Sequence, residues 1–207
     1  GRFAALTNYR DLSSLKTDAP SRGDIIVQFL ESKDSIPDFL KTFKQKSGRY
    51  NGFNLLAGDC HTQYWFSNQT GEIGLVSPGI HGISNHLMDT PWPKVSQGKE
   101  SLERAIDADT PNSEILNSET LDTKTLFDLL SDTSTPGDAL LPDTGVGLEW
   151  ERLLSPVFIK SPTYGTRSSI TMGITSRGKI QVTERTYFPD PKTPPRDHYF
   201  SFSPDES

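Results

Sequence analysis

Residues 36–76 read IPDFLKTFKQKSGRYNGFNLLAGDCHTQYWFSNQTGEIGLV, and the hydrophobic period changes once within this stretch. Over residues 36–46 the apolar side chains recur three and four positions apart, which predicts an amphipathic helix. Residues 50–58, 63–67 and 73–76 are short apolar runs separated by turn residues, which predicts three strands. Helices that are segregated from runs of antiparallel strands indicate an α+β fold rather than βαβ winding. The apolar face of the predicted helix comprises Ile36, Phe39, Leu40 and Phe43, behind the expected N-cap Ser35.

The rest of the chain continues the alternation between helices and groups of strands. A helix is expected over residues 22–31, and Thr90-Pro91 opens another helix that extends through Ile106. The remaining expected elements are a short strand over 80–84, a helix over 121–130, and strands over 157–160, 168–174, 179–185 and 198–202. We expect mobile loops over 108–119 and 132–147, a proline-rich tail over 189–207, and a single domain over 1–207.

Composition excludes several classes of function. The 207 residues include 21 Lys or Arg and 27 Asp or Glu, which gives a formal net charge of −6. This charge argues against nucleic-acid binding, which requires a basic surface, and it disfavours a polybasic membrane anchor. No integral membrane segment is expected, because no apolar run of about 20 residues occurs in the sequence. The single cysteine, Cys60, excludes an internal disulfide framework and a multi-cysteine metal site.

The first residues have the pattern of the second half of a β-hairpin. Gly1 and the mostly apolar residues 3–6 resemble the segment from Gly178 onward, which is expected to follow a hairpin turn. The later segment is preceded by its partner strand, residues 168–174, whereas the early one is not. We therefore expect that N-terminal strands are missing from this chain. The alternative is that Gly1 is a genuine processed terminus.

Cysteine and histidine supply two further candidates for chemistry. Cys60 and His61 are adjacent, but neighbouring residues of an extended chain point to opposite faces, so we interpret Cys60 as a small buried hydrophobe rather than a nucleophile. The four histidines do not have zinc-site spacing, and no metal site is expected. A single axial histidine suffices to hold haem iron, although ordinary surface or core positions also account for each histidine.

Three polar clusters at strand ends are the strongest candidates for a site, and they span residues 7–10, 83–86 and 164–169. An asparagine at a strand end can donate a hydrogen bond to a developing oxyanion. An arginine offers a planar fork for a carboxylate or a phosphate. Turn formation is the alternative that the residues themselves favour, because Asn and Gly are common turn residues.

These clusters, together with three further segments, resemble the transport-and-Golgi-organisation family, also called the NRDE family. The matching segments occur in the family's order and cover most of the chain. This sequence departs from the family at its start, because members begin with Met-Cys and carry an Asn-Arg-Asp-Glu motif that is absent here. The segments are GRFAALTNYR (1–10), YNGFNLL (50–56), GISNHL (82–87), TPWPK (90–94), YGTRSS (164–169) and ER (184–185).

The resemblance implies a fold similar to that of the N-terminal-nucleophile hydrolases, a four-layer αββα sandwich of antiparallel sheets. It also implies that Asn8 and Asn85 match oxyanion positions and that Arg167 matches an orienting position. An N-terminal Cys or Ser supplies the nucleophile in that superfamily. Gly1 has the amine but no nucleophilic side chain, so this chain is predicted to be inactive as such a hydrolase.

The resemblance further implies a role in intracellular transport. We expect a hydrophobic ligand, either haem or an acyl-CoA-like lipid, in the αββα cleft, with contacts from His81, His86 and Tyr164. No cofactor is required in this interpretation, and haem is a cargo. The expected location is cytoplasmic, with mitochondrial or Golgi association. The alternative function is an amidohydrolase or acyltransferase that uses the N-terminal Cys absent from this chain.

Overall fold

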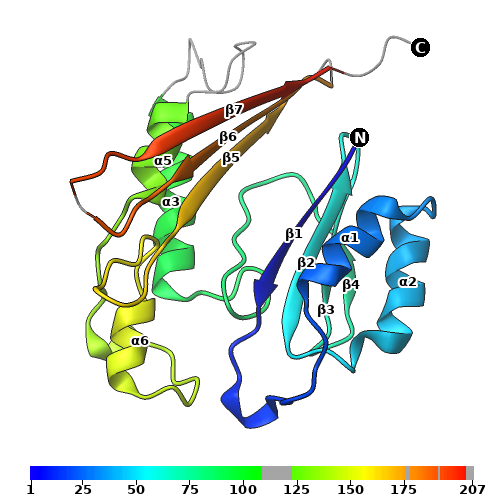
Figure 1. The fold of residues 1–207 in the computed structure, drawn as a ribbon, viewed down its shortest axis with the longest axis horizontal. Helices are drawn as coiled ribbons and strands as arrows, with labels where there is room; N and C mark the ends of the chain where they lie inside the picture. Colours follow the sequence, from blue (N-terminus) through cyan, green and yellow to red (C-terminus); the bar gives the residue numbers. More distant parts are fainter. Residues whose placement is uncertain (109–122, 176–177, 191, 204–207) are drawn as a thin grey trace. The chain divides into compact units, whose positions relative to one another are not determined.

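A computed structural model describes residues 1–108, 123–175, 178–190 and 192–203 of the chain. The described residues form two compact units. The first unit comprises residues 1–91 and 143–147, and the second comprises residues 92–142 and 148–207. Each unit has its own antiparallel sheet and its own helices (Figure 1).

The sheet of the first unit has four strands in the order in which they occur along the chain. They are β1 (Arg2–Asn8), β2 (Phe53–Asp59), β3 (Gln63–Ser67) and β4 (Ile73–Leu75), and each pairs antiparallel with the next. In the register, Leu6 lies opposite Leu55, and Leu55 lies opposite Phe66. These three side chains therefore share one face of the sheet.

Helices α1 (Gly23–Glu31) and α2 (Ile36–Ser47) cover that face (Figure 1). The N-terminus of α2 is capped as the sequence predicts, because the Ser35 hydroxyl accepts a hydrogen bond from the backbone N–H of Asp38. Pro37 occupies the first turn, where its missing N–H has no intrahelical partner to lose. A short 3₁₀ segment, Leu12–Ser14, precedes α1.

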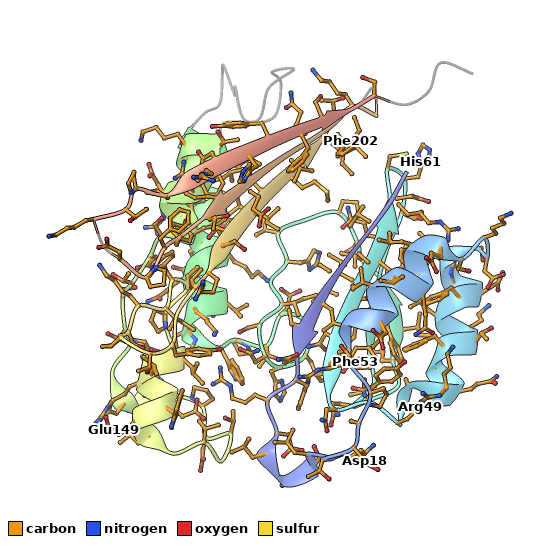
Figure 2. The ribbon with its side chains drawn as sticks, in the orientation of Figure 1. Asp18, Arg49, Phe53, His61, Glu149 and Phe202 are labelled. Atoms are coloured by element: carbon orange, nitrogen blue, oxygen red, sulfur yellow. The ribbon has the colours of Figure 1, made fainter. Side chains whose placement is uncertain are left out.

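Aromatic side chains dominate the core between this sheet and its helices. Phe43 of α2 is 1% exposed, and its ring stacks on Phe39 at 5.7 Å and meets Phe66 edge-on at 6.4 Å between centroids. Phe53 is fully buried between the helices and the sheet (Figure 2). Offset and edge-to-face contacts of this kind add to the free energy gained by burying apolar area. The buried core comprises Ile25, Phe29, Ile36, Phe39, Leu40, Phe43, Tyr50, Phe53, Leu55, Ala57 and Phe66.

The second unit is built from helices and a three-stranded sheet. Helices α3 (Pro93–Ala108) and α5 (Thr123–Leu130) pack together, and α6 (Leu148–Leu154) follows a 3₁₀ segment, Asp138–Leu140. The strands β5 (Ser168–Ile174), β6 (Ile180–Thr186) and β7 (Arg196–Phe202) pair antiparallel in that order.

The two faces of this second sheet are unlike each other. The face covered by α5 carries buried polar side chains from Thr171 and Thr183, and the Arg185 guanidinium lies 4.1 Å from the centre of the Phe127 ring of α5. The opposite face, which we call the open face, consists of the even-numbered residues of the three strands. Its apolar members are Ile170, Met172, Ile174, Ile180, Val182, Phe200 and Phe202.

The α+β class and the two antiparallel sheets are confirmed. The expected strand over 80–84 is wrong, because that backbone closes a loop on Asp89: the N–H of Asp89 donates to the Gly82 carbonyl. The strand expected over 157–160 reduces to one bridge between Lys160 and Gly165. The four-layer stacking and the single domain stay predictions.

Regular structure occurs in the predicted tail and in one of the two predicted loops. The tail predicted over 189–207 contains a complete strand, β7, which begins two residues before the expected 198–202. Residues 132–147 contain the 3₁₀ segment Asp138–Leu140, and Arg152 forms an ion pair with Asp138 at 2.6 Å. Their mobility stays a prediction. The loop expected over 108–119 falls, from residue 109 onward, outside the described residues.

In the part of the chain that the structure describes, every helix is too short or too polar to cross a bilayer.

We predict that Phe43→Ala lowers the free energy of unfolding by about 3–5 kcal/mol, because it leaves a cavity among four aromatic rings. Urea unfolding followed by circular dichroism measures this loss. The control is Leu30→Ala on α1, at a side chain that is 46% exposed, where a change within about 0.5 kcal/mol is expected. Equal losses in the two variants would contradict this assignment of the core.

Candidate functional site

The end of β1 and the loop 76–92 form a polar cluster in the first unit. The cluster joins two of the three segments that the sequence singles out, residues 7–10 and 83–86. We call it the strand-end clamp and define it by Tyr9, Arg10, Asn85 and His86. These segments are far apart in the sequence, so only the fold brings them together.

Asn85 uses both ends of its side-chain amide within the clamp. Its Nδ2 donates to the Asn8 carbonyl at 3.0 Å, and its Oδ1 accepts from Arg10 Nη2 at 3.1 Å. The Arg10 backbone N–H also donates to the Asn85 carbonyl at 2.7 Å. The amide that was predicted to stabilise an oxyanion therefore holds the loop to the strand in this structure.

Asn8 lies at the other predicted oxyanion position and behaves differently. It is the last residue of β1, and its side chain is exposed. Within the described residues, its side-chain amide makes no hydrogen bond. Asn8 is thus the one of the two asparagines whose amide is available to a ligand, and the oxyanion role stays a prediction.

His86 is enclosed by hydrogen bonds at both ring nitrogens. Its Nε2 lies 2.7 Å from the Tyr9 hydroxyl, and its Nδ1 lies 2.8 Å from Thr90 Oγ1. The Tyr9 and His86 rings are also in contact, with 4.8 Å between centroids. Burial lowers the pKa of His86 and raises that of Tyr9, because it disfavours the charged form of each group.

A buried asparagine that the sequence analysis missed supports this loop from beneath. Asn54 of β2 is 1% exposed, and its Nδ2 donates to the His86 carbonyl at 2.8 Å and to Thr7 Oγ1 at 3.1 Å. A carbonyl only accepts hydrogen bonds, so the nitrogen of the Asn54 amide must face His86. In the sequence, Asn54 could have been recognised as a polar residue within the otherwise apolar run from Phe53 to Leu56.

His81 is held in a second set of contacts in the same loop. Its Nδ1 lies 2.6 Å from Asp89 Oδ2, and its Nε2 lies 3.0 Å from the Ser77 carbonyl. Asp89 adopts φ 56° and also accepts a hydrogen bond from the Gly82 backbone N–H at 3.0 Å. Both predicted haem histidines therefore have partners at both ring nitrogens, and binding iron would require one of these contacts to break.

The remaining predicted site residues belong to the second unit. Tyr164 is 50% exposed, and its ring meets Trp150 edge-on at 6.1 Å between centroids. Arg167 is exposed, and its carbonyl accepts a hydrogen bond from the Tyr187 N–H at 2.8 Å. The roles of Tyr164 and Arg167 stay predictions.

Cys60 is exposed in the turn after β2, so its interpretation as a buried hydrophobe is wrong. The turn exposes it because Asp59 Oδ1 accepts backbone hydrogen bonds from His61 and Thr62, both at 2.8 Å. Among the described residues, no group of three His, Cys, Asp or Glu side chains could hold a metal ion.

Comparison with known proteins identifies the family. A family model described as Transport and Golgi organisation 2 matches residues 1–189. The chain belongs to the Transport and Golgi organisation 2 family. The Transport and Golgi organization 2 homolog of Mus musculus is 30% identical over 199 residues, which cover 90% of this chain and 68% of the relative. The Transport and Golgi organization protein 2 homolog of Homo sapiens is 29% identical over 199 residues, which again cover 90% of this chain and 68% of the relative. The resemblance to the transport-and-Golgi-organisation family is confirmed, and the likeness to the N-terminal-nucleophile hydrolases stays a prediction.

The asparagines at the two predicted oxyanion positions, Asn8 and Asn85, are predicted to contribute differently to the stability of this family member. Asn85→Ala removes two hydrogen bonds and should lower the free energy of unfolding by about 1–3 kcal/mol. Asn8→Ala is the matched control and should change it by less than about 0.5 kcal/mol, because its exposed amide has no partner among the described residues. Urea unfolding measures both. A larger effect at Asn8 than at Asn85 would contradict the clamp.

The lowered pKa of His86 predicts a pH dependence of stability. Below the pKa that histidine has in the unfolded chain, the unfolded state takes up a proton that the folded state resists, so stability falls as the pH falls. We expect the free energy of unfolding to decrease between pH 7.5 and 5.5. The decrease should be smaller in His86→Gln and unchanged in His198→Gln, whose side chain is exposed. The same pH profile in wild type and His86→Gln would contradict this assignment.

Proposed function

We propose that this chain acts in transport and Golgi organisation, as the names of its relatives indicate, by binding an amphipathic anionic ligand. Haem and acyl-CoA both fit this description, because each has a large apolar body and acidic groups. The observation that carries the proposal is the open face of the β5–β7 sheet. The apolar part of the ligand would lie on this face.

The open face combines exposure with apolar character. Ile170 is 58%, Met172 40%, Phe200 48% and Phe202 55% exposed. Large contiguous apolar surfaces are uncommon on proteins that bind nothing, and they mark sites for ligands or partners. Binding an apolar molecule here would remove these side chains from water, which is favourable in proportion to the area buried.

The register gives this face a polar end and an apolar end. Met172, Val182 and Phe200 form one cross-strand row, and Ile174, Ile180 and Phe202 form the next. The other end of the face is polar. Its last row contains Ser168, Thr186 and Arg196, and the row before it contains Ile170, Glu184 and His198. Arg196 is exposed, so its guanidinium can pair with a carboxylate or a phosphate of the ligand. This polarity suits a molecule with an apolar body and an anionic end.

The occupied ring nitrogens of His81 and His86 favour this surface over axial ligation by either histidine. Haem would then be held by its apolar face and its propionates. Amide hydrolysis, the alternative expected from the family resemblance, has no comparable support from the described contacts.

The test is a binding titration with haem, followed by its Soret absorbance, and with palmitoyl-CoA, followed by calorimetry. Met172→Glu places a negative charge on the open face and should weaken both ligands about tenfold or more, through lost apolar contact and charge repulsion. Arg196→Gln should weaken both and reduce their dependence on salt concentration.

The matched control is Leu75→Glu, at a 62% exposed position of β4 in the other sheet, which should bind like the wild type. Free CoA should bind far more weakly than palmitoyl-CoA. Absence of saturable binding of either ligand, or equal loss in Met172→Glu and Leu75→Glu, would overturn the proposal. His81→Ala combined with His86→Ala should leave the palmitoyl-CoA affinity unchanged.

A further inference from the structure

The edge strands of the two sheets differ in how well they are protected. Among the described residues, β1 and β4 are the edges of the first sheet, and β5 and β7 are those of the second. β4 has only three residues, β1 is mostly half-buried, and β5 alternates buried and exposed side chains. In β7, by contrast, six of the seven residues are exposed.

β7 lacks the features that usually prevent an edge strand from pairing with another chain. Edge strands are usually protected by an internal proline, a bulge, a short length or a lysine. β7 reads RDHYFSF, so it has seven residues and contains neither proline nor lysine, and its continuous pairing with β6 contains no bulge. Its one carboxylate, Asp197, is already paired with Arg185, at 2.8 Å for both oxygens. This ion pair and a hydrogen bond from the Tyr199 hydroxyl hold the pKa of Asp197 below its usual range. The negative charge of Asp197 is therefore neutralised within the sheet and does not repel another strand.

The order of side chains along β7 is complementary to itself. On the open face, the basic side chains Arg196 and His198 occupy the first half of the strand, and Phe200 and Phe202 occupy the second half. An antiparallel copy brings the basic half of one strand against the aromatic half of the other. Cations and aromatic faces attract each other, and aromatic cross-strand pairs stabilise sheets.

We propose that β7 pairs antiparallel with β7 of a second copy of this chain, with Tyr199 opposite its own counterpart on the two-fold axis. In this register Arg196 lies opposite the second copy's Phe202, His198 opposite its Phe200, and Asp197 opposite its Ser201. The three-stranded sheets of the two copies then form one continuous sheet. A parallel arrangement is disfavoured, because it would bring Arg196 beside Arg196 and Asp197 beside Asp197.

The dimer is isologous, since the same strand is used by both copies. A contact made by one strand from each side is small, and interfaces of this size are weak and transient. The dimer should therefore form at high protein concentration and dissociate on dilution. The backbone groups of β7 on the side away from β6, which pair with no other described strand, supply the hydrogen bonds, and Tyr199 sets the register.

Sedimentation velocity over a series of protein concentrations tests this proposal. The wild type should shift from monomer towards dimer as concentration rises. Tyr199→Lys and Tyr199→Glu each place two like charges opposite each other on the axis, and each should raise the dissociation constant at least about tenfold. An equal mixture of the two variants places Lys opposite Glu and should restore the dimer.

The controls separate this interface from a general effect of charge or a loss of folding. Leu75→Lys changes an exposed side chain on β4 and should dimerise like the wild type. Tyr199 is 70% exposed, so both variants should keep the wild-type circular dichroism and unfolding midpoint. A wild type that stays monomeric at every concentration, a mixture that fails to dimerise, or an equal loss in Leu75→Lys would each overturn the proposal.

Discussion

The buried amide of Asn54 is the interaction on which the arrangement of the first unit depends. An amide taken out of water costs free energy unless it forms hydrogen bonds, and Asn54 is 1% exposed. Its two donated hydrogen bonds, to Thr7 and to the His86 carbonyl, tie the loop 76–92 to the sheet. Asn85 and His86 can then reach the end of β1, so the clamp is a consequence of one polar residue in an apolar strand.

The second unit follows a different physical constraint, the inverted polarity of its sheet. Thr171 and Thr183 are buried on the helix-covered face, whereas Met172 and Phe200 are exposed on the open face. A sheet usually places its apolar face against its helices, because this removes the apolar area from water. Within the described residues, four large apolar side chains of the open face, Ile170, Met172, Phe200 and Phe202, are 40–58% exposed. A molecule or layer that covers them would gain the free energy of burying this area, which is the basis of the proposed ligand site.

The two proposals use the same strand in different ways. Ligand binding depends on side chains that project from the open face, such as Phe200, whereas self-association depends on the backbone edge of β7 and on Tyr199, which projects from the opposite face. Pairing of two copies would join their open faces into a wider apolar surface, with Arg196 of each copy beside the aromatic end of the other. The two activities are thus compatible. Met172→Glu tests ligand binding alone and Tyr199→Lys tests self-association alone, whereas Arg196 takes part in both.

The sequence by itself determined the helices, most of the strands and the α+β class, because periodicity, caps and turn residues act over a few neighbouring positions. The family was recognised separately, from the resemblance of six segments in their order along the chain. It also singled out residues 7–10 and 83–86 as polar strand ends. Only the tertiary structure decided that Asn85 and His86 are engaged rather than available, since their partners at Asn8, Arg10 and Tyr9 are more than 70 positions away. Alternation along 168–174 likewise shows which residues share a face, but packing of α5 decides which face is covered. The strand expected over 80–84 failed for a local reason, because two hydrogen bonds between Asp89 and Gly82, seven positions apart, close a loop there and outweigh a weak strand preference.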